Sequence, residues 1–170
     1  MKFADPSDAN KGLLFDGRIT ENFKLATGTW VAVGPLREAF IDHFAPYVKD
    51  VVIAGLDRDE VGALIFVDLD ACLSLCRSPE LEGSSELVKI AAHPEVRAEF
   101  HRRLKAFAAK STGSSNRITR AILLDEPASI DRDEITDKGS INQRAVISNR
   151  AYVVEELYAE PPRERVITIA

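Results

Sequence analysis

The sequence contains few residues of the kinds that bind metal ions or form cross-links. Its 170 residues include two cysteines, Cys72 and Cys76, and three histidines, His43, His93 and His101. Structural metal sites are usually assembled from several such residues at short, regular spacing, and these five are not spaced in that way. We therefore expect two reduced and packed thiols, structural histidines, and no metal site.

Long apolar runs and an excess of positive charge are also missing. No stretch approaches the ~20 apolar residues that a membrane-spanning helix needs, and residues 1–6 contain no apolar core of a secretory signal. The 22 Lys and Arg against 27 Asp and Glu leave a formal net charge of -5. This balance argues against general binding to nucleic acid or to an anionic membrane surface. We expect a cytoplasmic protein with neither kind of partner.

Several common catalytic signatures are absent as well. The sequence has no Gly-x-Gly-x-x-Gly, no phosphate-loop pattern and no Gly-x-Ser-x-Gly elbow. The acidic groups at 57–60 and 131–134 lack the glycine and the spacing of a calcium loop. Hydrophobic residues make up 45% and charged residues 29%, which is typical of a soluble globular domain. Composition alone therefore leaves the function open.

The apolar pattern predicts one small α+β domain over residues 1–170, in which a hairpin leads into a roughly three-stranded sheet flanked by helices. The hairpin is expected to have arms at 23–25 and 30–33 and its bend at 27–29. Core strands are expected at 51–54, 63–67 and 117–124, with Ile118 and Ile122 on one face. Helices are expected at 34–44, 69–77, 86–92, 94–110 and 144–158. Residues 1–20 are expected to form a hinge segment, and residues 159–170 a frayed tail.

The first segment that stands out is the hairpin with the residues just before it. It combines Gly17-Arg18 with Lys24 and a bend of small residues, Thr27-Gly28-Thr29. Small residues at a hairpin tip allow the backbone to approach a ligand closely. An ordinary surface hairpin remains the alternative interpretation.

The second segment is Lys138-Gly139-Ser140, which precedes the last expected helix. Such a loop can hold an anion through backbone N–H groups and the lysine ammonium. The alternative is a glycine turn followed by a helix N-cap at Ser140.

Together, in this order and separation, the two segments resemble the C-terminal domain of the acyl-adenylate-forming superfamily of CoA synthetases, luciferases and adenylation domains. The family has a Gly-Arg hinge motif, a following Lys and a Gly-tipped hairpin, which here correspond to Gly17-Arg18, Lys24 and Thr27-Gly28-Thr29. Its last motif, of the form Thr-x-x-Gly-Lys-Ile, corresponds to 136–141. The residue-by-residue sequence at 17–31 and 135–144 looks most like that of the feruloyl-CoA synthase branch.

The resemblance implies a two-step reaction in which a carboxylate and ATP, with Mg²⁺, give an acyl-adenylate, and CoA then displaces AMP. The small domain rotates between the steps. By position, Arg18 would contact the nucleotide and Thr20 would be the hinge. The hairpin residues Lys24, Thr27, Gly28 and Thr29 would serve the thioester step, and the loop with Gly139 would face the α-phosphate. One departure stands out: the family's catalytic lysine aligns with Ser140, while this chain has its lysine at Lys138.

The family's large N-terminal domain, with its phosphate loop and acyl pocket, has no counterpart in these residues. The resemblance therefore implies a fragment whose partner is that missing domain, together with acyl-adenylate and CoA, and whose Met1 need not be the natural start. We expect the fragment to be inactive alone and to hold no cofactor tightly. A free-standing α+β binding module and the same domain of a long-chain fatty acyl-CoA ligase are the alternatives. The acid substrate and the oligomeric state are left open.

Overall fold

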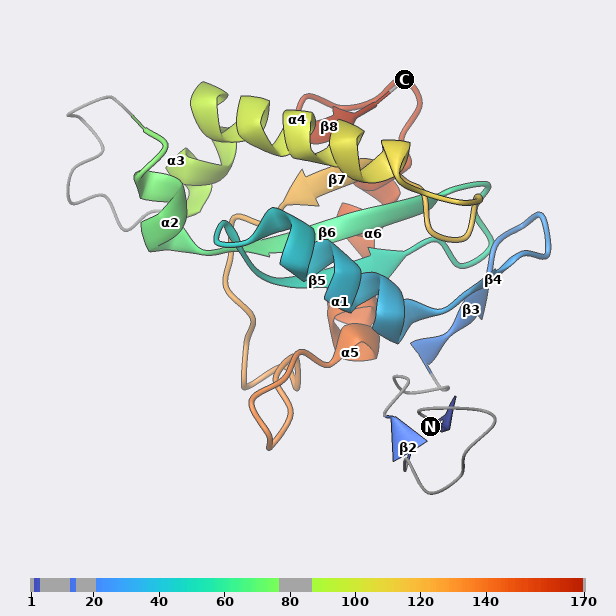
Figure 1. Cartoon of the computed structure of the whole chain (residues 1–170). Coiled ribbons are helices and arrows are strands. Elements are labelled where there is room, and N and C mark those ends of the chain that lie inside the picture. The colour runs from blue at the N-terminus through green and yellow to red at the C-terminus, as the bar shows by residue number, and fades with distance from the viewer. Residues whose placement is uncertain (1, 4–12, 15–20, 77–86, 170) are drawn as a thin grey trace.

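A four-stranded mixed sheet forms the centre of the computed structural model, which describes residues 2–3, 13–14, 21–76 and 87–169. Its strands, in spatial order, are β5 Val48–Ala54, β6 Val61–Val67, β7 Ile118–Leu123 and β8 Val166–Thr168 (Figure 1). The central pair β6–β7 is parallel, and the outer pairs are antiparallel. The α+β class is confirmed, with one strand more than the three expected.

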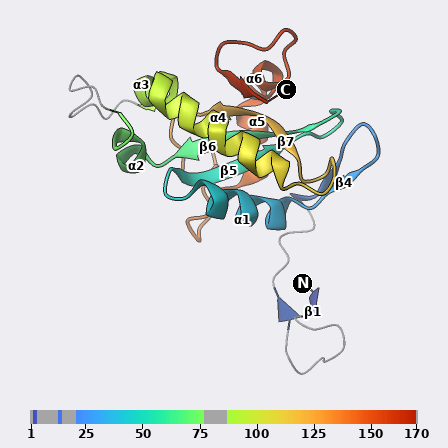
Figure 2. The same cartoon turned by 45° about the horizontal axis from the view of Figure 1, so that its top comes forward.

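Helices cover both faces of this sheet, as the two views show (Figures 1 and 2). The helices on one face are α1 Val33–Phe44, α3 Leu87–Ala92 and α4 Pro94–Ala109, with the short α2 Leu69–Leu73 beside them. The helices on the other face are α5 Gln143–Asn149 and α6 Ala151–Leu157. Two small antiparallel pairs complete the described fold: β1 Lys2–Phe3 with β2 Leu13–Leu14, and β3 Phe23–Lys24 with β4 Trp30–Val31.

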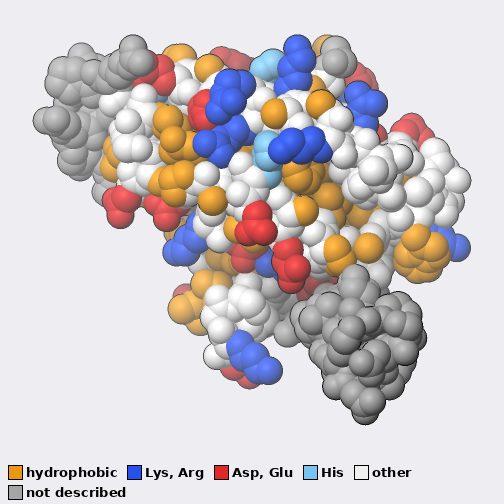
Figure 3. All heavy atoms as spheres, viewed as in Figure 1, with side chains coloured by type: hydrophobic (Ala, Val, Ile, Leu, Met, Phe, Trp, Pro, Cys, Tyr) orange, Lys and Arg blue, Asp and Glu red, His pale blue; other side chains and the backbone are white. Residues whose placement is uncertain are grey.

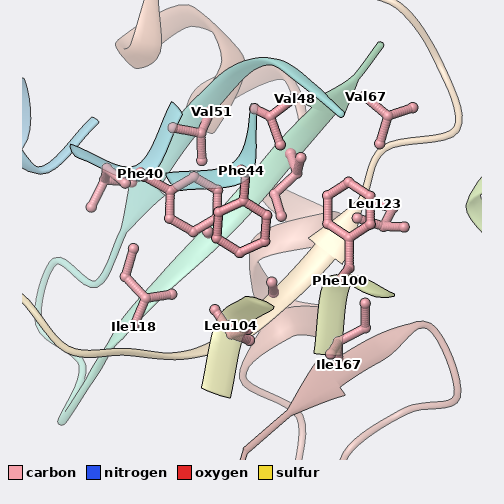
Figure 4. Close-up of a cluster of buried hydrophobic side chains, with 14 of the residues drawn as sticks. Phe40, Phe44, Val48, Val51, Val67, Phe100, Leu104, Ile118, Leu123 and Ile167 are labelled. Carbon is pink, nitrogen blue, oxygen red and sulfur yellow. The ribbon is translucent and has the colours of Figure 1, made fainter. Parts of the chain in front are cut away.

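The larger core cluster lies under α1 and α4 (Figure 4). Phe40 and Phe44 of α1 are stacked, with ring centroids 4.1 Å apart and planes 15° from parallel. Phe100 and Leu104 of α4 pack against them from the other helix. The four-residue spacing of Leu36, Phe40 and Phe44 predicts this buried face, and all three are buried.

A bulge in β7 corrects one prediction about its side chains. Ile118 pairs with Val61 and Arg120 pairs with Gly62, so one extra residue is inserted between them. An extra residue reverses the inward and outward alternation of a strand. Ile118 therefore packs in the cluster under α1 and α4, whereas Ile122 packs under α5 and α6. The expectation that the two isoleucines share a face is wrong.

The C-terminal part differs from the expected helix and tail in two ways. The closing helix is broken at Arg150, whose φ of -110° and ψ of 33° separate α5 from α6. The last residues also do not fray throughout, because β8 pairs with β7 and completes the sheet. Arg97 of α4 donates to the carbonyl oxygens of Glu164 at 2.7 Å and Arg165 at 3.0 Å, which holds the segment before β8 in place.

The two cysteines are free thiols. Cys72 is buried in α2, and burial raises its pKa to about 12. The helix ends earlier than expected, so Cys76 lies beyond it. In the described part of the chain, no group of three or more His, Cys, Asp and Glu side chains could hold a metal ion. Within the same residues, no helix is both long enough and apolar enough to cross a membrane.

Candidate functional site

The β3–β4 hairpin presents a tight turn to solvent. The Leu25 amide donates to the Thr29 carbonyl at 2.9 Å, and the Gly28 amide donates to the Leu25 carbonyl at 2.9 Å. Gly28 has a φ of +84°, and a Cβ added there would meet nothing within 4 Å. Thr27 and Gly28 are exposed and Thr29 is half-buried. The backbone conformation therefore requires glycine, and the space around it is open.

The hairpin is attached to the rest of the domain by its alternate residues. Phe23, Leu25 and Val31 are buried in the core cluster under α1 and α4. The Ala26 amide also donates to the Arg58 carbonyl at 2.8 Å, in the turn between β5 and β6. On the outer side, the Lys24 ammonium lies 5.2 Å from the centre of the exposed Trp30 ring. One side of the hairpin thus fixes its position, and the other side meets solvent.

The second candidate segment is also a turn closed by its own hydrogen bonds. The Thr136 amide donates to the Ser140 carbonyl at 2.8 Å, and the Gly139 amide donates to the Thr136 carbonyl at 2.8 Å. The Ser140 amide donates to the Thr136 hydroxyl oxygen at 3.3 Å. Gly139 has a φ of +77°, and a Cβ there would also meet nothing within 4 Å. An anion at this turn would therefore rely on the Lys138 ammonium, since these amides are engaged.

Lys138 is exposed at this turn, and within the described residues no ion pair or hydrogen bond engages its ammonium. The helix that follows begins at Gln143, and Asn142 is its N-cap, with its side chain accepting from the Ala145 amide at 3.4 Å. The alternative interpretation of Ser140 as the helix N-cap is therefore wrong. Ser140 belongs to the turn, where its hydroxyl lies 2.8 Å from that of Thr136.

A buried ion pair holds the base of this second turn. Arg150 donates to both carboxylate oxygens of Glu134, at 3.0 and 2.8 Å, and both side chains are almost fully buried. The Arg150 guanidinium also donates to the carbonyls of Glu126 and Pro127 and lies over the Phe66 ring. The hydrogen bonds from Arg150, above all, keep the pKa of Glu134 below its usual value. The pair therefore ties the loop between β7 and α5 to the helix that follows it.

The sequence reasoning did not find this anchor. It also gave no role to Gln143, whose side-chain oxygen accepts from the Ile53 amide at 2.9 Å on the edge strand β5. A Glu and an Arg 16 residues apart give no local pattern, so only the fold brings them together.

The structure places the two glycine turns far apart on the molecule. In Figures 1 and 2 the β3–β4 hairpin lies beside the N-terminal end of α1, whereas the loop before α5 extends from the other side of the sheet. Lys24, Thr27, Gly28 and Thr29 thus form one surface, and Lys138, Gly139 and Ser140 form another. Gly17, Arg18 and Thr20, expected to contact the nucleotide and form the hinge, lie outside the described residues.

The AMP-binding enzyme C-terminal domain family model matches residues 21–161, which include both turns and all of the sheet except β8. The chain belongs to this family. The match accounts for the order of hairpin, sheet and closing helices described above. No curated protein matches the sequence significantly.

Solved structures share the fold of this C-terminal domain. The adenylation domain of a carboxylic acid reductase from Segniliparus rugosus, in complex with AMP and a co-purified carboxylic acid, superposes with a TM-score of 0.62 and 20% identity. The match covers 87% of this chain and 21% of that one. The adenylation domain of a Mycobacterium chelonae carboxylate reductase matches with a TM-score of 0.58 and 20% identity, over 85% of this chain and 20% of that one. The chain thus spans about a fifth of the solved proteins that it matches, and at this identity the likeness concerns the fold.

Proposed function

We propose that the chain acts as the mobile C-terminal domain of an ATP-dependent acid–CoA ligase of the feruloyl-CoA synthase type. Its partner is a large N-terminal domain that holds ATP, Mg²⁺ and the acid. The domain presents one turn during adenylate formation and the other while CoA forms the thioester. In the first orientation a cation offsets charge developing at the α-phosphate, and closure excludes water from the reactive adenylate.

The observation that supports this proposal is the pair of open glycine turns on separate parts of one sheet domain. Gly28 and Gly139 both adopt positive φ, and neither has a neighbouring atom within 4 Å of an added Cβ. The positive φ accounts for glycine at each tip, and in the described part of the chain nothing packs over either tip. A domain that rotates would bring first one glycine turn and then the other to the same reaction centre. Each turn would therefore have to fit closely against the surface of the partner domain.

Lys138 is the residue proposed to act in adenylation. Ser140, which aligns with the family's lysine, is hydrogen-bonded inside its turn and carries no charge. Lys138 lies at the exposed part of the same turn and is not engaged by another described side chain. We propose that it replaces the missing ammonium, with Arg18 and Thr20 serving as nucleotide contact and hinge.

The first experiment measures pyrophosphate release from the 170-residue chain with ATP, Mg²⁺, CoA and ferulate. We expect no turnover, because the phosphate loop and acyl pocket would belong to the partner domain. Turnover by the chain alone would contradict the proposal. A panel that adds long-chain fatty acids to the complete enzyme separates the feruloyl-type ligase from the fatty acyl alternative.

The second experiment separates the two steps in the complete enzyme. Lys138→Ala should slow adenylate formation by about 10²-fold, as expected for losing one charge-stabilising contact. It should leave thioester formation from preformed feruloyl-adenylate unchanged. Lys105→Ala, on the exposed side of α4, is the matched control and should affect neither step. Equal adenylation rates for the Lys138 and Lys105 variants would remove Lys138 from the mechanism.

Gly28→Leu should show the reverse pattern, because a large side chain at the hairpin tip would obstruct the path of the CoA thiol. Gly28→Ala introduces the same backbone strain with little bulk, so it controls for strain. The expected result is slow thioester formation for leucine, with alanine close to the parent. Similar losses for both variants would mean that the backbone conformation alone matters.

A second candidate function is suggested by the matched solved structures, which are adenylation domains of carboxylic acid reductases, one of them within an A-PCP didomain. In that case the acyl group would pass to a carrier-bound thiol instead of free CoA. Comparing acyl transfer to CoA and to a phosphopantetheinyl carrier protein decides between the two. The glycine turns would serve either acceptor in the same way.

A further inference from the structure

A cavity of about 580 Å³ opens beside the hairpin, away from its glycine tip. It lies between α1, the end of α4 and the loop that follows α4, and Trp30 forms one side. Its volume falls within the roughly 300–1,000 Å³ of typical small-molecule sites. Neither Gly28 nor Gly139, the glycines of the two candidate turns, lines this cavity.

The lining combines an apolar surface with one available cation. Leu36 and Phe107 provide apolar contact, and Trp30, which is 61% exposed, provides a large aromatic surface that, among the described residues, only the Lys24 ammonium covers, 5.2 Å from the ring centre. Lys110 is the cation, and no ion pair or hydrogen bond of the described residues engages its ammonium. No carboxylate belongs to the described lining, so nothing there competes for Lys110.

Cationic side chains lie near the cavity although the whole chain has a net charge of -5. Figure 3 shows Lys and Arg side chains gathered over α4. Lys105 is exposed on the last turns of this helix, whereas the neighbouring Arg102 is paired with Glu99 at 2.7 Å. His43 also lines the cavity, and its Nε2 lies 3.0 Å from the Arg103 carbonyl oxygen, to which it donates. Burial lowers the pKa of His43, which disfavours its charged form, and Lys110 is the one lysine of the described lining.

The loop that closes the cavity is held by its own hydrogen bonds. The Asn116 side-chain oxygen accepts from the amides of Thr112 and Gly113, each at 3.1 Å, and its nitrogen donates to the Thr112 hydroxyl at 3.0 Å. These bonds leave the Ser115 hydroxyl as a polar group on the lining. A wall fixed in this way lowers the ordering cost of binding a ligand.

We propose that this cavity binds an amphipathic aromatic monocarboxylate, with its carboxylate on Lys110 and its ring against Trp30, Leu36 and Phe107. A single cation complements a single negative charge, whereas a polyphosphate would require several. The apolar and aromatic lining suits a flat ring. This site differs from the acyl pocket of the proposed ligase, which would lie in the partner domain, and it does not depend on that activity.

The test uses the 170-residue chain and 3-phenylpropanoate as the probe, with 3-phenylpropan-1-ol as its neutral analogue. Trp30 is the only tryptophan, so its emission reports binding at the cavity directly, and calorimetry gives the affinity independently. We expect the carboxylate to shift the emission to the blue and to bind about tenfold or more tightly than the alcohol, as a charge-assisted contact provides.

Three variants locate the site. Lys110→Met should weaken binding of the carboxylate about tenfold or more and leave that of the alcohol unchanged. Lys105→Met, an exposed lysine of the same helix outside the lining, is the matched control and should keep the parent affinity. Ala39→Phe adds a ring at an exposed lining position and should abolish binding of both probes, and circular dichroism confirms that each variant is folded.

Three results would overturn the proposal. One is equal affinity for the carboxylate and the alcohol, and another is an equal loss in the Lys110 and Lys105 variants. The third is no binding of 3-phenylpropanoate at millimolar concentration. AMP serves as a further probe. If AMP binds, Ala39→Phe abolishes that binding, and 3-phenylpropanoate does not bind, then the cavity is a nucleotide site instead.

Discussion

The hairpin around Gly28 and the turn around Gly139 look alike at their tips and differ at their bases. Both tips contain an exposed glycine with positive φ and nearby exposed lysine. The base of the hairpin is apolar, with Phe23 and Leu25 packed in the core. The base of the second turn is ionic, with the buried Glu134–Arg150 pair at its centre.

This difference determines which substitutions the base of each turn can accept without a large loss of stability. Apolar packing is non-directional and adapts to small changes, whereas a buried charge keeps its cost unless its own partner remains. The base of the second turn therefore depends on one ion pair that has to stay complete. The predictions below measure how unequal the two bases are.

The largest effect is expected from Arg150→Met. The substitution leaves the Glu134 carboxylate buried without its cation, which typically costs about 3–5 kcal/mol of unfolding free energy. Urea denaturation measures it. Arg132→Met is the control, since Arg132 and Glu126 form an exposed pair 3.9 Å apart, and its cost should stay below about 0.5 kcal/mol. Combining Arg150→Met with Glu134→Leu should recover much of the loss, and no recovery would show that packing, and not the stranded charge, sets the cost.

The next largest effect is expected at the other base. Leu25 is 2% exposed, and Leu25→Ala should cost about 2–4 kcal/mol through lost burial and a residual cavity. Leu56, which is 62% exposed in the adjoining turn between β5 and β6, provides the matched control. Leu56→Ala should lie within about 0.5 kcal/mol of the parent in the same denaturation experiment. A larger loss for Leu25→Ala than for Arg150→Met would reverse the comparison.

The sequence predicts the features that depend on local patterns and misses those that depend on pairing between distant segments. The buried face of α1 was predicted correctly because its apolar residues, Leu36, Phe40 and Phe44, recur every four residues. The hairpin was predicted correctly because its two strands and its bend lie next to one another in the sequence. Strand β8 was missed because its three residues follow a proline-containing polar segment and are stabilised only by pairing with β7. The bulge in β7 was missed because its register depends on the neighbouring strand.

The surface position of the two candidate turns was predictable in the same way. Glycine and lysine at both turns are local signals, and the structure places both turns at the surface. The Glu134–Arg150 anchor joins residues 16 apart, and the closing helix breaks at the same Arg150; no periodicity indicates either feature. The roles of Lys24, Lys138 and their neighbours stay predictions, as do those of Arg18 and Thr20.

The ionic base should also make stability depend on pH. The pKa of Glu134 is held below its usual value by Arg150, so the unfolded chain takes up this proton first as the pH falls. The pair's contribution is complete above the ordinary Glu pKa of about 4.3 and is lost as the pH falls through the lower folded value. Glu134→Gln should therefore flatten the decline in unfolding free energy on acidification. Glu99, whose pKa is lowered to about 2 through Arg102 and Arg103, is present in both proteins, so the difference curve isolates Glu134. Parallel curves would contradict the assignment.

Replacing the glycine at either tip by alanine should lower the stability of the domain by the same amount. Gly28→Ala and Gly139→Ala each place a Cβ in open space but force a left-handed conformation, at a cost of about 1–2 kcal/mol. Gly113→Ala is the control, because Gly113 also has open space and no positive φ. That variant should be neutral or slightly stabilising, since alanine restricts the unfolded chain. Thermal unfolding of the three variants separates backbone strain from contact, and unequal losses at Gly28 and Gly139 would mean that one turn can relax.

The smallest effect is expected from the two exposed lysines near the tips. Lys24 lies over Trp30 at 5.2 Å, so Lys24→Met removes a cation–π contact that contributes about 0.5–1 kcal/mol at an exposed position. Methionine keeps the unbranched aliphatic stem, so the change reports mainly on the charge. Lys138→Met removes a charge that no described partner engages, and its effect on stability should lie within experimental error. Because Trp30 is the only tryptophan, its emission should change in the Lys24 variant and stay constant in the Lys138 variant. A measurable loss of stability for Lys138→Met would show that this lysine stabilises its own turn, and its exposure would then be explained without any partner domain.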